Sequence, residues 1–303
     1  MSTIALGETD IRSRIWAWLD RWRPEPLLWS APLVVISVPF FILPLVAIIW
    51  VSFFGGLVTA PRTGNFLASY WAIVSEGYYL SVYANTLGTA VGVTALTFVL
   101  GFPLAYFMVR WAGPWLPWLI WILYLPIIVS VVVRVFGWMV ITADRGLINQ
   151  ILVSLTLVDR PVRLLYEIEA MTLAMVHRYL PLMVLPLVNA IGKIDMSMDR
   201  AASSLGAGRI RVMTSITLPL ALPGIFAGTQ LVFASVLSDF VMPSLLGTTR
   251  FPMMAPAIFE QSVQLLNWMP AAAIASVLLI FVVAYLLLTT LTYRRFTRWA
   301  ALG

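Results

Sequence analysis

Long apolar runs without a charged residue constrain this chain more than any other feature of its sequence. No Asp, Glu, Lys or Arg occurs between Glu25 and Arg62, or between Glu260 and Arg294. A helix needs about 20 predominantly apolar residues to cross the hydrocarbon core of a bilayer. Of the 303 residues only 11% are charged, whereas soluble domains average about 25%. The sequence therefore predicts an all-α protein that crosses a membrane several times.

Six stretches are long and apolar enough to form membrane-spanning helices. We place them at about 30–53, 85–109, 117–141, 168–191, 219–245 and 269–292. In the second span, Gly88 and Gly92 have the spacing at which small residues let two helices pack closely. In the fourth span we expect an interruption at His177-Arg178-Tyr179, followed by Pro181 and Pro186. Such a break is tolerated where it faces protein or water.

The spans divide the chain into an amphipathic N-terminal segment at 1–29, a six-span domain at 30–293 and a tail at 294–303. Within the first segment, residues 10–23 have the pattern of an interfacial helix with tryptophan anchors. Residues 54–84 form a loop, and residues 143–167 form a loop with a short amphipathic helix at 147–157. Most of the 19 basic residues fall on one side of the membrane when both termini are cytoplasmic. The positive-inside rule favours that orientation.

One polar stretch, 192–218, interrupts the apolar sequence between the fourth and fifth spans. Asp199 is a candidate N-cap for a helix that starts at about Arg200, and Gly206 and Gly208 are candidate stop signals. Residues 209–216 alternate basic and apolar side chains, as in a helix that lies at a surface. The stretch therefore predicts a helical hairpin at the cytoplasmic face.

This hairpin resembles the cytoplasmic "EAA" loop of type I ABC-importer permeases. The resemblance is carried by Ala201-Ala202, Gly206, Leu218-Pro219 and Pro223-Gly224. Arg200 stands where the family has Glu, and Asp199, the neighbouring carboxylate, is rotated about 100° away on a helix. In the family the loop docks into a cleft of the ATPase subunit. The resemblance assigns docking to seven residues: Asp199, Arg200, Ala201, Ala202, Ser203, Leu205 and Gly206.

The resemblance extends over residues 85–290 and is nearest to the spermidine/putrescine permease branch. Further matches are Asn85-Thr86-Leu87, Arg134 followed by Trp138, and Gly146-Leu147-Ile148-Asn149. It implies a multi-pass subunit of the bacterial inner membrane with four kinds of partner: a second permease, two ATPase subunits, an extracytoplasmic substrate-binding protein and the lipid bilayer. ATP and Mg would be bound by the ATPase subunits, with no cofactor in this chain. The implied cargo is a polyamine, and aminoethylphosphonate, an opine or ferric iron are the alternatives within the branch.

The residues that enzymes need are missing from the sequence. It has no cysteine, one histidine, His177, and one lysine, Lys193. No HExxH or GxSxG motif occurs, and the residues around Lys193 do not form a phosphate-binding Walker A loop. We expect neither an enzyme nor the ATPase itself. The net charge of +6 reports membrane orientation, so no nucleic-acid partner is expected.

Charged residues within the spans indicate where a solute passes. Asp239 is the only carboxylate placed well inside a span, and it either receives the ammonium group of a cationic solute or pairs with Arg178 or Arg134. Three aromatic residues are candidates to face the same path by cation–π attraction: Trp138, Tyr179 and Phe240. The two arginines instead suit an anion, so charge alone does not choose the cargo. An ion-coupled secondary transporter is the alternative from another class, but it needs more carboxylates than Asp239.

Overall fold

The computed structural model describes the chain except for residues 1–25, 56–67, 248–250 and 301–303. By its internal contacts the chain divides into two units, Met1–Trp50 and Val51–Gly303, and each is described by itself. The first unit contains most of α2 (Pro26–Phe54), an uninterrupted helix with three internal prolines that matches the predicted first span. The predicted interfacial helix at 10–23 lies outside the described residues.

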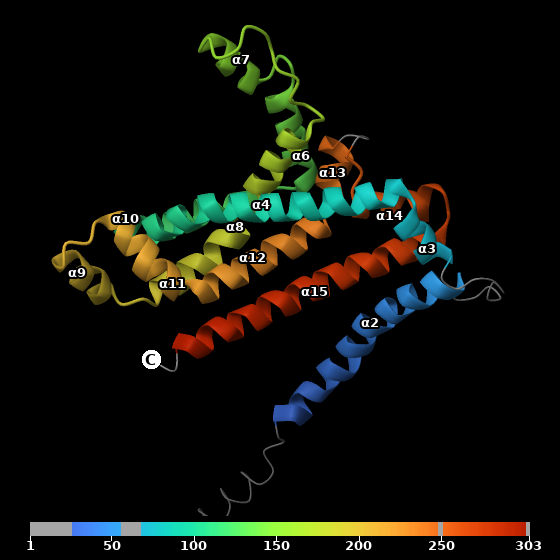
Figure 1. Ribbon diagram of the computed structural model, residues 1–303, viewed down its shortest axis with the longest axis horizontal. Coiled ribbons are helices and arrows are strands. Elements are labelled where there is room, and N and C mark those ends of the chain that lie inside the picture. The colour runs from blue at the N-terminus through green and yellow to red at the C-terminus, as the bar shows by residue number, and fades with distance from the viewer. Residues whose placement is uncertain (1–25, 56–67, 248–250, 301–303) are drawn as a thin grey trace, which may run out of the picture. The chain divides into compact units, whose positions relative to one another are not determined.

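The described part of the second unit is helical and has no strand (Figure 1). Its α-helices are α3 (Ala68–Ser75), α4 (Gly77–Arg110), α5 (Leu116–Ile128), α6 (Val131–Thr142), α7 (Leu147–Ser154), α8 (Ile168–Gly192), α9 (Met196–Ser204), α10 (Arg209–Val212), α11 (Leu218–Leu220), α12 (Leu222–Leu237), α13 (Val241–Leu246), α14 (Met254–Phe259) and α15 (Trp268–Ala300). Helices α9 and α10 lie at one end of the long helices, α3 and α14 lie at the other end, and α6 and α7 project away from them.

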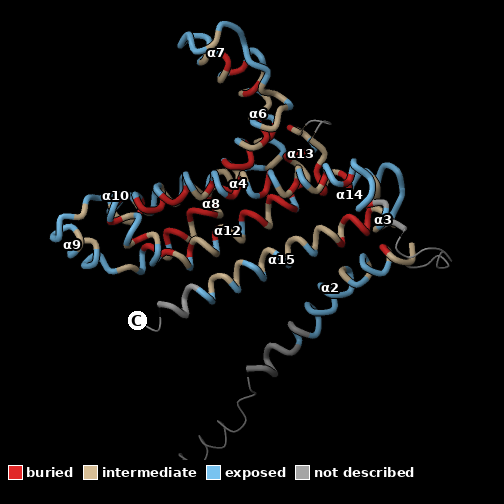
Figure 2. The backbone as a smooth tube through the Cα atoms, in the orientation of Figure 1, coloured by how far each residue is buried: buried red, intermediate tan, exposed pale blue. Residues whose placement is uncertain are grey.

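The core is formed by α4, α8 and α12, which pack side by side and bury the faces they share (Figure 2). Glycines allow this close approach. An ideal Cβ on Gly101 of α4 would lie 3.1 Å from Met183 Cγ, and one on Gly228 of α12 would lie 2.8 Å from Met183 Sδ. Gly88 and Gly92 make no such close approach within the described chain, because an added Cβ there meets no described atom within 4 Å.

Four described helical segments are long and apolar enough to cross a membrane: Val35–Phe54, Gly77–Arg110, Ile168–Gly192 and Trp268–Arg295. Two further helix pairs pass the same test together but are bent: Gly113–Ile128 with Val131–Ser154 by 94°, and Arg209–Leu220 with Leu222–Leu237 by 74°. The count reaches six if each bent pair forms one span. The predicted all-α membrane fold is therefore confirmed, with two of its predicted straight spans replaced by bent ones.

Local backbone chemistry explains both bends. Between α5 and α6, Val129 is extended, with φ −71° and ψ 134°, after a helix that contains Pro126. Between α11 and α12, Pro223 stands in the first turn of the new helix and has no N–H to continue the preceding hydrogen-bond ladder. The predicted span at 219–245 also ends early, because α12 stops at Leu237 and a separate helix, α13, starts at Val241.

Other predicted boundaries also differ from the structure. The fourth span is not interrupted at His177-Arg178-Tyr179, since α8 runs through these residues and through both prolines. The predicted loop at 54–84 contains α3 and the first turns of α4. Residues 294–300, predicted as part of the tail, continue α15. The short helix predicted at 147–157 is present as α7, at Leu147–Ser154.

Candidate functional site

The helical hairpin predicted at 192–218 is built from α9 (Met196–Ser204) and α10 (Arg209–Val212). Helix α9 is capped by Asp195, whose Oδ1 accepts a hydrogen bond of 2.9 Å from the backbone N–H of Ser197. The cap predicted at Asp199 was therefore wrong by one helical turn. The N–H of Ser197 also holds the pKa of the Asp195 carboxyl below its usual value, because a hydrogen bond to the charged form favours that form.

The end of α9 is a Schellman turn centred on Gly206. Gly206 has φ +81°, and its N–H bonds to the carbonyl of Ser203 at 3.0 Å. The N–H of Ala207 reaches back to the carbonyl of Ala202, also at 3.0 Å. This pair of bonds defines the motif, and its left-handed residue is usually glycine. The stop signal predicted at Gly206 is therefore confirmed. Gly208 does not end α9, because it is the extended residue before α10.

The carboxylate of Asp199 points inward and ties the hairpin to the end of α4. Its Oδ2 lies 2.8 Å from Nε of Arg110, and the two side chains are 16% and 4% exposed. Arg110 also donates from Nη1 to the carbonyl of Ile194 at 3.2 Å. A second contact places the Arg209 guanidinium 5.3 Å from the ring centre of Trp111. Sequence reasoning missed Arg110, because nothing near it in the sequence indicates that its partner is Asp199.

The outward surface of the hairpin combines apolar and cationic side chains. Leu205 is 89% exposed and Ile210 is 76% exposed, and Arg200, Arg209 and Arg211 are exposed beside them. Of the other predicted docking residues, Ala201, Ser203 and Gly206 are exposed and Ala202 is half-buried. Asp199 is the exception, because its carboxylate is engaged with Arg110. Large apolar side chains this exposed among charged ones are typical of an interaction surface.

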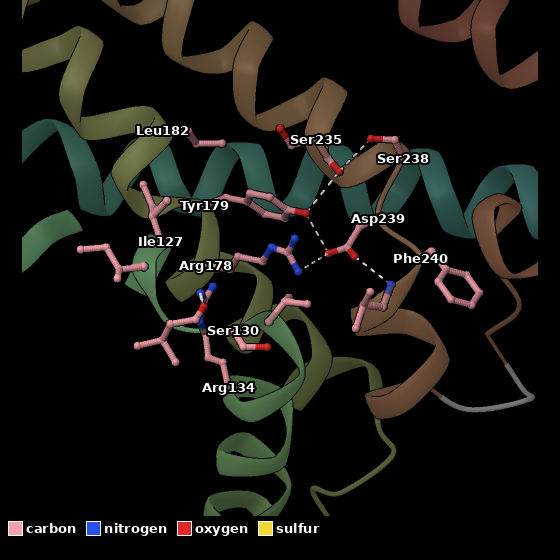
Figure 3. Close-up of a pocket in the computed structure, with 14 residues that line it drawn as sticks. Ile127, Ser130, Arg134, Arg178, Tyr179, Leu182, Ser235, Ser238, Asp239 and Phe240 are labelled. Atoms are coloured by element: carbon pink, nitrogen blue, oxygen red, sulfur yellow. Dashed lines mark hydrogen bonds and ion pairs between the residues drawn. The ribbon is translucent and has the colours of Figure 1, made fainter. Parts of the chain in front are cut away.

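A cavity of about 640 Å³ lies at the other candidate site, between the two helix breaks (Figure 3). The break between α5 and α6 contributes Ser130, and the break between α12 and α13 contributes Asp239. Fourteen residues line the cavity: Ile127, Ile128, Val129, Ser130, Val131, Arg134, Arg178, Tyr179, Leu182, Ser235, Ser238, Asp239, Phe240 and Val241. Non-helical backbone within a membrane span is tolerated where it lines a cavity.

Asp239 is held by four groups and is almost inaccessible. Tyr179 donates its hydroxyl to Oδ2 at 2.7 Å, and the backbone N–H groups of Val241 and Met242 lie 3.1 and 3.3 Å from Oδ1. Arg178 Nη1 lies 3.7 Å from Oδ2, and the Asp239 side chain is 2% exposed. The sequence left two roles open for Asp239, binding of a solute's ammonium group or pairing with an arginine. In the structure Asp239 pairs with Arg178.

The predicted aromatic residues are only partly brought together. Tyr179 and Phe240 line the cavity with Asp239, and Arg178 lies 5.3 Å from the ring centre of Tyr179. Trp138 is not among the lining residues. Its indole Nε1 lies 3.4 Å from Nδ1 of His177 instead. Sequence reasoning missed Ser130, Ser235 and Ser238, since serines in apolar spans give no specific signal.

Metal binding has no support among the described residues, which contain no group of three or more His, Cys, Asp or Glu side chains able to hold an ion.

Comparisons with known proteins agree with this architecture. Residues 97–298 match the family model described as "Binding-protein-dependent transport system inner membrane component". The spermidine/putrescine transport system permease protein PotB of Escherichia coli is 29% identical over 69% of this chain and 76% of the relative. The putative 2-aminoethylphosphonate transport system permease protein PhnU of Salmonella typhimurium is 29% identical over 78% of this chain and 83% of the relative.

A solved structure shows the same fold at lower identity. A chain of a bacterial ABC transporter involved in the import of alginate superposes with a TM-score of 0.73 at 18% identity, covering 93% of this chain and 99% of that chain. The family model spans most of the described helices of the second unit, including the hairpin and all the cavity-lining residues. The chain therefore belongs to the family of binding-protein-dependent transport system inner membrane components, as a permease subunit of an ABC importer and not an enzyme.

Proposed function

We propose that the α9–α10 hairpin is the segment through which an ATPase subunit drives this permease. The observation that carries the proposal is the exposure of Leu205 and Ile210 on an element tied to the core helix α4 by the Asp199–Arg110 ion pair. An apolar tip among charged side chains gains free energy when a partner covers it. Movement of an ATPase subunit bound to Leu205 and Ile210 would be transmitted to α4 through the Asp199–Arg110 ion pair.

The proposed assembly contains a second permease, two ATPase subunits that bind ATP and Mg, and an extracytoplasmic binding protein. The family description and the relatives support this composition, and a related alginate transporter is known in complex with its periplasmic protein. Both termini and the hairpin would lie in the cytoplasm, as the distribution of basic residues predicts. ATP binding would close the ATPase pair, displace the hairpins and open the path between the permeases to the outside.

For the cargo, we propose a small amine-bearing solute. The relatives named for spermidine and putrescine transport make a polyamine the first candidate. The second candidate is aminoethylphosphonate, named for the relative PhnU. The specific observation in its favour is that the cavity exposes Arg178 while the carboxylate of Asp239 is already engaged.

The test is the ATPase activity of the reconstituted importer, made from this chain, its partner permease and the ATPase subunits. Binding protein loaded with spermidine, putrescine or aminoethylphosphonate is added in turn. We expect one loaded form to stimulate hydrolysis, and Leu205→Asp or Gly206→Pro to abolish that stimulation. Leu157→Asp is the matched control, because Leu157 is 66% exposed in the predicted outer loop. A Leu205→Asp complex that retains full stimulation would contradict the docking role.

A further inference from the structure

The charged residues that line the cavity are not equally accessible to a solute. The lining contains two arginines and one aspartate, and its other members are uncharged. Asp239 is 2% exposed and accepts hydrogen bonds from Tyr179 and from the backbone at the start of α13. A carboxylate with these partners is stabilised in place and needs no further cation. Asp239 therefore holds the break between α12 and α13 together, and it offers the cavity almost no accessible surface.

The two arginines, in contrast, line the cavity with side chains that are only partly buried, and the Arg178 side chain is 25% exposed. Nη1 of Arg178 is 3.7 Å from Asp239, beyond hydrogen-bond distance, and it has no hydrogen-bond partner within the described chain. Arg134 donates from Nη2 to the carbonyl of Val129 at 2.7 Å, but its buried Nε has no partner among the described residues. A buried donor without an acceptor costs about 1–3 kcal/mol or more when charged.

Arg134 and Arg178 are placed so that both can bind the same group of a solute. Arg134 comes from the first turn of α6 and Arg178 from the middle of α8, and both side chains extend into the same cavity (Figure 3). Guanidinium groups present planar pairs of N–H donors that match the two oxygens of a carboxylate or phosphonate. Ser130, Ser235 and Ser238 add hydroxyl groups to the lining. A cavity of this size lies within the range of small-molecule sites.

We propose that Arg134 and Arg178 form a subsite for an oxyanion group, a carboxylate or a phosphonate, of the transported solute. This inference rests on the proposed function and narrows its amine-bearing cargo to a small zwitterion, which favours the second candidate, aminoethylphosphonate, over the polyamine suggested by the relatives. Asp239 has a positioning role, because its charge holds Arg178 at the edge of the cavity. A lipid phosphate is a poor occupant: Arg178 lies ten residues beyond Ile168, which is about 15 Å along the helix axis and near half the thickness of the hydrocarbon core.

The test measures equilibrium binding by calorimetry to the complete importer in nanodiscs, without the binding protein. Three probes share an aminoethyl unit: 2-aminoethylphosphonate, β-alanine and putrescine, of which only the first two carry an oxyanion. We expect at least one oxyanion probe to bind and putrescine not to bind. Arg134→Gln and Arg178→Gln should each weaken that binding about tenfold or more, the worth of a charge-assisted hydrogen bond. Arg178→Lys should weaken it less, because the charge remains.

Two controls keep the result interpretable. Arg163→Gln removes an exposed arginine that does not line the cavity, and it should leave binding unchanged. Arg134→Gln leaves the Arg178–Asp239 pair intact, so it tests the subsite even if Arg178→Gln fails to assemble. Absence of binding by both oxyanion probes, or unchanged binding in both glutamine variants, would overturn the inference.

Putrescine that binds the wild type, and binds the glutamine variants more tightly, would overturn it in favour of a cation site. The proposed function is judged separately by ATPase stimulation, so it survives any of these outcomes.

Discussion

Replacement of Gly224 by alanine should force apart the two helices that connect the cavity with the hairpin. Gly224 is buried in the first turn of α12, against α8. An ideal Cβ at this position would lie 2.6 Å from Ala190 Cβ and 2.7 Å from the backbone oxygen of Pro186. Ordinary contacts begin at 3.4 Å, so the helices must separate locally by about 0.8 Å. A backbone oxygen cannot move aside by changing rotamer, and the strain therefore reaches the helix axes.

The expected cost follows from this overlap. An extra methyl group in a packed core destabilises by about 1–3 kcal/mol, and the gain from removing a helical glycine, about 0.5–1 kcal/mol, offsets part of it. The net loss is about 0.5–2 kcal/mol. For a domain of this size each kcal/mol lowers the melting temperature by about 2–4 °C, so the Gly224→Ala midpoint should fall by about 1–8 °C.

The assay is thermal unfolding of the purified chain in detergent at a fixed scan rate, which matters because membrane proteins often unfold irreversibly. Gly92→Ala in α4 is the matched control, since its added Cβ meets no described atom within 4 Å. It should leave the midpoint unchanged or raise it slightly. Equal midpoints for Gly224→Ala and Gly92→Ala would refute the described packing of α8 against α12.

Three further predictions concern individual polar contacts. In a double-mutant cycle of Arg110→Met and Asp199→Leu, thermal unfolding should give a coupling of about 1–3 kcal/mol, because a partly buried ion pair is lost; a coupling near zero would remove the link between hairpin and α4. Asn149→Leu should speed hydrogen exchange in the segment after α7, since its amide donates to Ala143 and accepts from the N–H of Val162; unchanged exchange would contradict this clamp. Tyr179→Phe should destabilise the chain by about 1–2 kcal/mol through loss of the 2.7 Å bond to Asp239, whereas an unchanged melting temperature would show that the hydroxyl contributes nothing there.

Local features of the fold could be predicted from the sequence. The first and last spans follow from uncharged runs, because a charged residue is costly in the bilayer whatever the tertiary fold of the chain. The turn at Gly206 follows from a residue that adopts positive φ without strain. The pattern at 192–218 also indicates the family, since the residues that carry the resemblance lie in one continuous segment.

Contacts between segments distant in the sequence could not be predicted. Spacing marked Gly88 and Gly92 as packing sites, but the direction in which a glycine faces depends on where the neighbouring helix lies, and the close approaches are at Gly101, Gly224 and Gly228. The same reason explains why the partner of Asp199 was missed.

The sequence by itself determined that this chain is a multi-span, all-α permease with a helical hairpin, because hydrophobicity, glycine and capping residues act over a few turns. Only the tertiary structure decided which charged side chains are enclosed by protein groups and which remain accessible to a solute or a partner. It turned Asp199 toward Arg110 and enclosed Asp239 behind Tyr179 and the start of α13. It left Arg134 and Arg178 in the lining of the cavity, with the Arg178 side chain 25% exposed. The physical reason is that a charge is neutralised by whatever lies within a few ångströms in space, and only packing of the helices sets those neighbours.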